Sequence, residues 1–198
     1  SSAPSLGDFS AAGVTGVDNS NRLAVASALA STAISSAEVN TTAELQTLVD
    51  AYRLILAEAN GSATDATPTQ NPTAATYGAI GASTAASLAN GSAAQALLND
   101  TIANLSPGHV DRISKIEALA TTAETIAQLA ALSTVPTPAP NLSAADFSAL
   151  GIGGVTTDNL RSVLAAIAST ANDGSAIDTQ IALQSVVDTA IEAYKQQI

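Results

Sequence analysis

Residues able to do chemistry are few in this sequence, and none of them falls into a familiar pattern. Cysteine is absent, which excludes thiolate nucleophiles, disulfides and zinc–thiolate sites. His109 is the only histidine, so a site built from Cys and His, or from several His ligands, is excluded as well. It stands in Ser106-Pro-Gly-His109, where a loop enters a helix, and we predict a solvated loop side chain instead of a general base.

Two pairs of carboxylates have the residue types that acid–base catalysis needs: Glu44 with Asp50, and Asp178 with Asp188. Their spacings put the members of each pair on different faces of a helix, and Glu44 is already a helix cap. No Asp-x-Asp-x-Asp run or Gly-Asp nonapeptide is present to bind calcium. We therefore predict no enzymatic activity, no cofactor and no metal site.

Two glycine segments, 13–16 and 151–154, are similar in composition to a phosphate-binding loop. Such a loop follows a strand and carries a lysine, and neither signal is present here. We predict that both segments are turns that end helices.

Helices must position these side chains, and the clearest helix signal covers residues 41–61. Thr41 stands three residues before Glu44, which is the spacing of a capping box. An apolar stripe with a period of about 3.6 residues follows; its members are Leu45, Leu48, Val49, Tyr52 and Leu56. Asn60-Gly61 then ends the helix, because either residue tolerates the left-handed conformation of a C-terminal cap.

The sequence contains an internal repeat. When it is shifted by 138 residues, segments 5–50 and 143–188 align without a gap, and 20 of the 46 pairs are identical. A middle copy lies between them, with Tyr77 at an offset of 68 from Phe9 and Ile116 at an offset of 71 from Leu45. Three residues inserted close to Asn90-Gly91 account for the difference.

Each copy predicts three helices: a short one with an aromatic residue and a closing glycine, a second that starts at Asp18, Ser92 or Thr156, and a third with the longest apolar stripe. The residues that define the repeat are Phe9, Gly13, Leu45, Val49, Tyr77, Gly81, Ile116, Phe147, Gly151, Leu183 and Val187. We therefore predict an all-α fold, in which three repeats of about 60–70 residues form tandem three-helix bundles.

Changes in composition mark the domain boundaries. The predicted bundles cover 1–61, 72–132 and 140–198, with linkers at 62–71 and 133–139. Because Pro136 and Pro138 fix φ and remove donors, we expect the second linker to be an extended, semi-rigid spacer. The alternative is a loop packed on one larger helical domain, since Ala-rich faces also pack between units.

Composition and charge limit the partners. Six basic against 17 acidic residues give a net charge of −11, which repels nucleic acid and anionic lipid, and no apolar run is long enough for membrane insertion. Alanine occupies 44 positions, so each small core is thin and gains stability when neighbouring repeats stack on it. The opening at Ser1, without Met or an apolar leader, favours a mature or excised piece.

The repeat resembles the GA module, a three-helix albumin-binding repeat of bacterial surface proteins, and more closely the GA-like repeats of very long secreted bacterial adhesins. The residues that carry this resemblance in the first copy are Phe9, Gly13-Val14, Asn21 and 46–50; in the third copy they are Phe147, Gly151-Ile152, Asn159 and 184–188. The middle copy keeps Tyr77 and Gly81 but has Thr121 in place of the aspartate. The resemblance implies a surface-exposed bundle that spaces or binds and does no chemistry.

These observations favour an extracellular or cell-surface stalk or spacer segment of a large adhesin-like protein, acidic and alanine-rich, with neighbouring repeats as partners. One alternative is a self-assembling subunit of a filament or surface layer, whose partners are like subunits. A second alternative is a module that binds a host or surface protein, as albumin-binding modules do. We expect no tight albumin binding, because the chain has no Trp and its aromatic residues fall at core positions.

Overall fold

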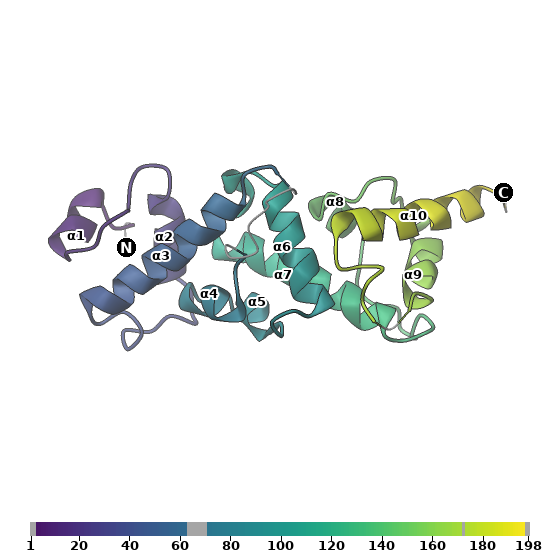
Figure 1. Ribbon diagram of the computed structural model, residues 1–198, viewed down its shortest axis with the longest axis horizontal. Coiled ribbons are helices and arrows are strands. Elements are labelled where there is room, and N and C mark those ends of the chain that lie inside the picture. The colour runs from purple at the N-terminus through teal and green to yellow at the C-terminus, as the bar shows by residue number, and fades with distance from the viewer. Residues whose placement is uncertain (1–2, 63–70, 172, 197–198) are drawn as a thin grey trace. The chain divides into compact units, whose positions relative to one another are not determined.

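The computed structural model describes residues 3–62, 71–171 and 173–196, and within them every regular element is a helix (Figure 1). The predicted all-α fold is therefore confirmed. The helices are α1 (Leu6–Ala11), α2 (Arg22–Leu29), α3 (Thr42–Glu58), α4 (Ala74–Ala79), α5 (Ser83–Ser87), α6 (Ala93–Asn104), the 3-10 helix η1 (Pro107–His109), α7 (Ile113–Ala130), α8 (Ala144–Ala149), α9 (Leu160–Ala168) and α10 (Gln180–Lys195).

Two compact units make up the chain. The first contains residues 1–87 and 102–118, and the second contains 88–101 and 119–198. Each unit therefore combines one outer copy of the sequence repeat with part of the middle copy. In the first unit α3 packs against α2 and α4, and α4 packs against α5; in the second, α9 packs against α10. The division into three separate bundles stays a prediction.

The first helix of each copy closes in the same way. Gly13 has φ +75°, its N–H donates to the carbonyl of Ser10 at 3.0 Å, and the N–H of Val14 donates to the carbonyl of Phe9 at 3.0 Å. This pair of bonds is a Schellman motif, which requires a left-handed residue and so favours glycine. The same two bonds close α4 at Gly81 and α8 at Gly151. The glycine segments are helix-ending turns, as their sequence predicts.

The apolar stripe of α3 is buried in its middle and half-buried toward its ends. Thr41 and Glu44 form the predicted capping box, and Leu48, Val49 and Tyr52 are at most 1% exposed. Leu45 and Leu56, which the stripe also includes, are half-buried, and Ile55 is fully buried. From Leu48 the buried apolar residues of the helix recur at i+1, i+4 and i+7, which is one face of a helix.

The middle copy has an additional helix. α5 lies between α4 and α6, in the part of the copy that contains the three-residue insertion, and no periodic signal predicted it. The α6 helix begins next to the insertion. Ser92 accepts the N–H of Gln95 at 3.3 Å, and the Gln95 side chain accepts the N–H of Gly91 at 2.9 Å.

Residues 133–139 bend instead of running fully extended, and they lie against α9. Together with Leu142, which is 7% exposed, they form one wall of a groove whose other wall contains Leu160 and Leu164. No helix runs through this segment, because α7 ends at Ala130 and α8 begins at Ala144. The first predicted linker, 62–71, lies largely outside the described residues.

Candidate functional site

The chemistry-bearing residues lie apart, each with a local partner. His109 is exposed in η1, and its Nδ1 lies 2.9 Å from the Ser106 hydroxyl, which agrees with a solvated loop side chain. Glu44 serves as the cap of α3, and Asp188 accepts a hydrogen bond within α10. Among the described residues, no three His, Asp or Glu side chains come close enough to hold a metal ion. Each of these three contacts is local, between residues three or four apart.

The most regular polar arrangement is a glutamine clamp, in which a side chain of the third helix holds the loop between the first two helices. In the third copy, Gln184 Oε1 accepts the N–H of Gly153 at 2.7 Å, and Gln184 Nε2 donates to the carbonyl of the same glycine at 3.2 Å. The amide also donates to Asp188 at 2.8 Å. Because both ends of the Gln184 amide are used, the aspartate fixes its orientation.

The first copy has the same clamp, and the middle copy keeps only its bond to the loop N–H. In the first, Gln46 accepts the N–H of Thr15 at 2.9 Å, donates to its carbonyl at 3.1 Å, and donates to Asp50 at 3.0 Å. In the middle copy the corresponding residue is Glu117, whose carboxylate oxygens each lie 3.0 Å from the N–H of Thr84. The sequence marked these positions as shared but gave no reason, since the bonded loop lies about thirty residues upstream.

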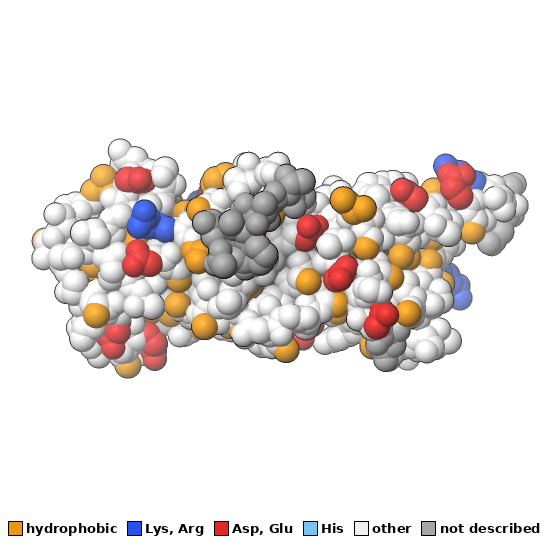
Figure 2. All heavy atoms as spheres, in the orientation of Figure 1, with side chains coloured by type: hydrophobic (Ala, Val, Ile, Leu, Met, Phe, Trp, Pro, Cys, Tyr) orange, Lys and Arg blue, Asp and Glu red, His pale blue; other side chains and the backbone are white. Residues whose placement is uncertain are grey.

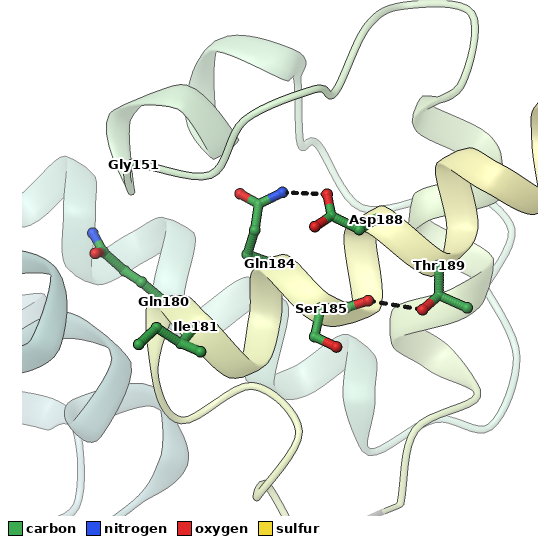
Figure 3. A pocket seen from close by; sticks show the side chains of 7 residues that line it. All are labelled: Gly151, Gln180, Ile181, Gln184, Ser185, Asp188 and Thr189. Atoms are coloured by element: carbon green, nitrogen blue, oxygen red, sulfur yellow. Dashed lines mark hydrogen bonds between the residues drawn. The ribbon is translucent and has the colours of Figure 1, made fainter.

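An open depression of about 540 Å³ lies beside the clamp of the third copy (Figure 3). Its lining residues are Gly151, Gln180, Ile181, Gln184, Ser185, Asp188 and Thr189. Most of their polar atoms serve the fold: Gln180 donates to the carbonyl of Leu150, and Thr189 donates to that of Ser185. Ile181 is 80% exposed. The depression therefore offers few unused polar groups to orient a small ligand.

Two tyrosines in the first unit have strongly raised pKa values. Burial raises the pKa of Tyr52, and the negative charge of Asp111 raises it further. Burial also raises the pKa of Tyr77, with a smaller effect from Glu58. Both rings are fully buried, so these phenols stay neutral and serve as core residues.

Carboxylates at caps and turns have lowered pKa values. The backbone N–H and the hydroxyl of Ser5 lower the pKa of Asp8, and the hydroxyl and N–H of Ser20 lower that of Asp18. The backbone N–H and the hydroxyl of Ser175 lower the pKa of Asp173. Hydrogen bonds to the ionised form are the cause in each case, and they fit structural roles.

Within the first unit, three side chains of the first copy bind the backbone of the middle copy. The Ser27 hydroxyl accepts the N–H of Ile113 at 3.0 Å, the Ser31 hydroxyl donates to the carbonyl of Gly81 at 3.0 Å, and Tyr52 donates to that of Val110 at 3.0 Å. We call the contacts between two consecutive copies a junction. A Cβ on Gly81 would lie 2.8 Å from the side chains of Ile34 and Ser31, so this approach requires glycine.

A second junction lies within the second unit. The Asp100 carboxylate accepts the N–H of Gln180 at 2.7 Å. The backbone also approaches closely, because a Cβ on Gly174 would lie 2.5 Å from that of Ala93. In both junctions an acceptor on the second helix of one copy, α2 or α6, receives the first N–H of the third helix of the next, α7 or α10. The array is joined by helix caps supplied in trans between copies.

Most of the repeat-defining residues lie where the repeat places them. The side chains that are at most 3% exposed are Phe9, Val49, Tyr77, Ile116, Phe147, Leu183 and Val187. Leu45 is half-buried, and Gly13, Gly81 and Gly151 all have φ between +75° and +79°. These positions belong to the core and to the helix-ending turns, and they do not gather into one site.

Sequence reasoning missed the junction residues. Ser27 and Asp100 occupy helix positions where Ser and Asp usually face solvent, and their partners lie 86 and 80 residues further along the chain. No local pattern marks such a pair. The one available signal was Gly81, because a glycine kept at a helix end also permits close approach of another segment.

On the face drawn in Figure 2, acidic side chains stand singly and apolar side chains form no broad patch. No family model, curated protein or solved structure matches the chain. No described helix is both long and apolar enough to cross a membrane. The candidate functional feature is therefore the pair of junctions.

Proposed function

We propose that this chain is a non-enzymatic stalk or spacer segment of a large bacterial surface or secreted adhesin-like protein. The observation that carries the proposal is the junction: consecutive copies are joined by hydrogen bonds between Ser27 and Ile113 and between Asp100 and Gln180. Copies that cap one another resist independent rotation, as repeats in a stacked array do. Stacked repeats of this kind are suited to a spacing role.

The surface supports a spacing role. With 17 acidic residues, six basic residues and no cysteine, the chain repels its own copies and needs no redox environment. The large apolar residues that stand out, Leu23 at 56% and Ile181 at 80% exposure, lie singly. Isolated exposed apolar residues are normal on a soluble surface. An extracellular location agrees with these features and stays part of the proposal.

Light scattering on the full chain tests this function. A stalk segment should remain monomeric up to high protein concentration at moderate salt. A filament or surface-layer subunit, the main alternative, should instead increase in mass with concentration. Concentration-dependent polymerisation would overturn the stalk proposal in favour of that alternative.

Calorimetric titration against serum albumin tests the remaining alternative, a host-protein-binding module. The aromatic residues that anchor tight interfaces are used internally here: Tyr52, Tyr77 and Phe147 are fully buried. We expect no binding at micromolar concentrations. A submicromolar dissociation constant would establish the albumin-binding function instead.

A further inference from the structure

The junctions identify a face on each copy that receives the preceding copy. We define this entry face by three aligned positions, one at the end of the first helix and two around the start of the third. Its residues are Ile80, Val110 and Ile113 in the middle copy, Leu150, Ile177 and Gln180 in the third, and Ala12, Val39 and Thr42 in the first. The alignment offsets are those of the sequence repeat.

In the middle copy, the entry face is covered by the first copy. Val110 is fully buried, and its carbonyl accepts the hydroxyl of Tyr52. Ile80 is also fully buried, and it precedes Gly81, whose carbonyl accepts the Ser31 hydroxyl.

In the third copy, residues of the middle copy meet the same face. Leu150 is fully buried and Ile177 is 1% exposed, and Ile177 follows the segment at Gly174 that lies against Ala93. Asp100 accepts the N–H of Gln180. The two internal entry faces are thus covered by the same kind of contact.

The first copy presents the corresponding face without a cover. Val39 is half-buried, although its counterparts are 0% and 1% exposed, and Ala12 and Thr42 are exposed. Among the described residues, no side chain accepts the N–H of Thr42, the counterpart of Ile113 and Gln180. Val39 keeps an apolar side chain in a loop that is otherwise polar, which fits a covered position better than a solvated one.

We infer that this first entry face is the docking site for a further repeat of the same kind, oriented as the first copy is on the middle one. The inference rests on the proposed function and identifies the partner of the array. The argument is continuity with an established interface, because the first N–H of the third helix receives a side chain of the preceding copy twice within this chain, at Ile113 and at Gln180. Ala12 is smaller than Ile80 and Leu150, so this docking buries less apolar area than the internal junctions do.

The occupant that matches the first junction carries the side chains that the first copy uses on the middle one. These are an acceptor at the position of Ser27, a hydroxyl at that of Ser31, and an aromatic anchor at that of Tyr52. The third copy matches it less well, since it has Ala165 and Ala190 at two of these positions.

An extended chain tests the inference. Residues 1–68 are placed directly ahead of Ser1 of the full chain, which reproduces the 68-residue spacing from the first copy to the start of the middle one. Hydrogen exchange is then followed at the amides of Val39 and Thr42 in the original first copy. We expect exchange at Thr42 to slow by about tenfold, the factor that one added hydrogen bond supplies.

The matched control is the same extended chain with Ser27→Ala and Tyr52→Phe in the added segment only, which removes two junction hydrogen bonds and keeps the buried ring. It should lose the protection at Thr42 and Val39. Unchanged exchange at both amides in the extended chain would overturn the inference, and so would equal protection in the control. An added segment that stays unfolded would also overturn it, because docking should stabilise an added repeat. Light scattering on the unextended chain tests the stalk function separately, so failure of the docking inference can be distinguished from failure of the stalk proposal.

Discussion

At the scale of single residues, polar side chains in this chain mostly hold loops in place. Gln46 and Gln184 each satisfy one N–H and one carbonyl of a loop, and Asp50 and Asp188 orient the amides. The sequence shows that these residues are shared by two copies. It does not show what they bind, because their partners lie 31 residues away in both cases.

Replacing Gln184 should destabilise the third copy. Gln184→Ala removes two hydrogen bonds to Gly153, so we expect the free energy of unfolding to fall by about 1–2 kcal/mol. Ser185→Ala, at an exposed neighbouring position, is the matched control and should change it by less than about 0.5 kcal/mol. Urea denaturation followed by circular dichroism measures both. Equal effects of the two substitutions would contradict the clamp.

Acid should destabilise the fold through two carboxylates that accept hydrogen bonds from nearby serines, Asp8 at the start of α1 and Glu38 in a turn. Their folded-state pKa values lie below the ordinary values, which are 3.8 for Asp8 and 4.5 for Glu38. A lowered folded pKa gives stability that is fully present above the ordinary pKa and is lost as pH falls through the folded pKa. We therefore expect the melting temperature to be constant above about pH 5 and to fall below about pH 4.

The variant Asp8→Asn provides the control for this pH dependence. It removes one titrating cap, so the melting temperature of the variant should change less between about pH 5 and about pH 3 than that of the parent chain. A single exposed carboxylate contributes little to stability. The melting temperatures of the parent chain and the variant should therefore be measured in parallel by calorimetry. A parent chain that is more stable at acidic pH than at neutral pH would contradict the lowered pKa values of these carboxylates.

At the scale of elements, helix starts were predictable where a Ser or Thr caps its own helix. The capping boxes at Ser5, Thr41 and Ser143 involve residues only three apart, which a sequence pattern can capture. The starts of the second helices were predicted too early, at Asp18 and Thr156. Helices α2 and α9 begin four residues later, at Arg22 and Leu160, because a turn precedes each of them.

The cause of the late start is a buried asparagine in each outer copy. Asn159 is 5% exposed, accepts the N–H of Thr156 at 2.8 Å and donates to the carbonyl of Gly154 at 2.9 Å. Asn21 makes the same two bonds to Asp18 and Gly16 in the first copy. A side chain that satisfies two loop groups stabilises the turn against an extra helical turn.

Asn159→Ala should therefore be among the more damaging polar substitutions. It removes both hydrogen bonds by which the buried Asn159 side chain holds the turn, and we expect a loss of about 1–2 kcal/mol in the free energy of unfolding. Asn141→Ala, at an exposed position before α8, is the control and should have little effect. Chemical denaturation measures both. A small loss at Asn159 would show that water replaces the side chain.

At the scale of the whole molecule, the repeat was readable from the sequence and the junctions were not. The helical class and the positions of the longer helices follow from period and caps, which are local. The contacts between copies depend on Ser27, Ser31 and Asp100, small polar residues with no distinguishing pattern. The α5 helix was missed for a related reason, because five residues carry too few apolar positions to show a period.

The junction in the first unit should depend on Tyr52. Its ring is fully buried and its hydroxyl binds the carbonyl of Val110, so Tyr52→Ala should lower the stability of that unit by about 3–5 kcal/mol. Tyr52→Phe keeps the ring and removes only the hydrogen bond, so its cost should be about 1–2 kcal/mol. Tyr194→Ala, a half-buried tyrosine near the end of α10, is the control for loss of an aromatic ring.

Hydrogen exchange locates the effect of Tyr52→Ala. Amides of α3 and of residues 110–118 should lose protection together, because they belong to one compact unit and meet at this side chain. Amides of α9 and α10 should keep more of their protection. Both helices belong to the second unit, and among the described residues no hydrogen bond joins Tyr52 to that unit. Loss of protection confined to α3, with 110–118 unaffected, would mean that the first and middle copies fold independently and that the junction does not couple them.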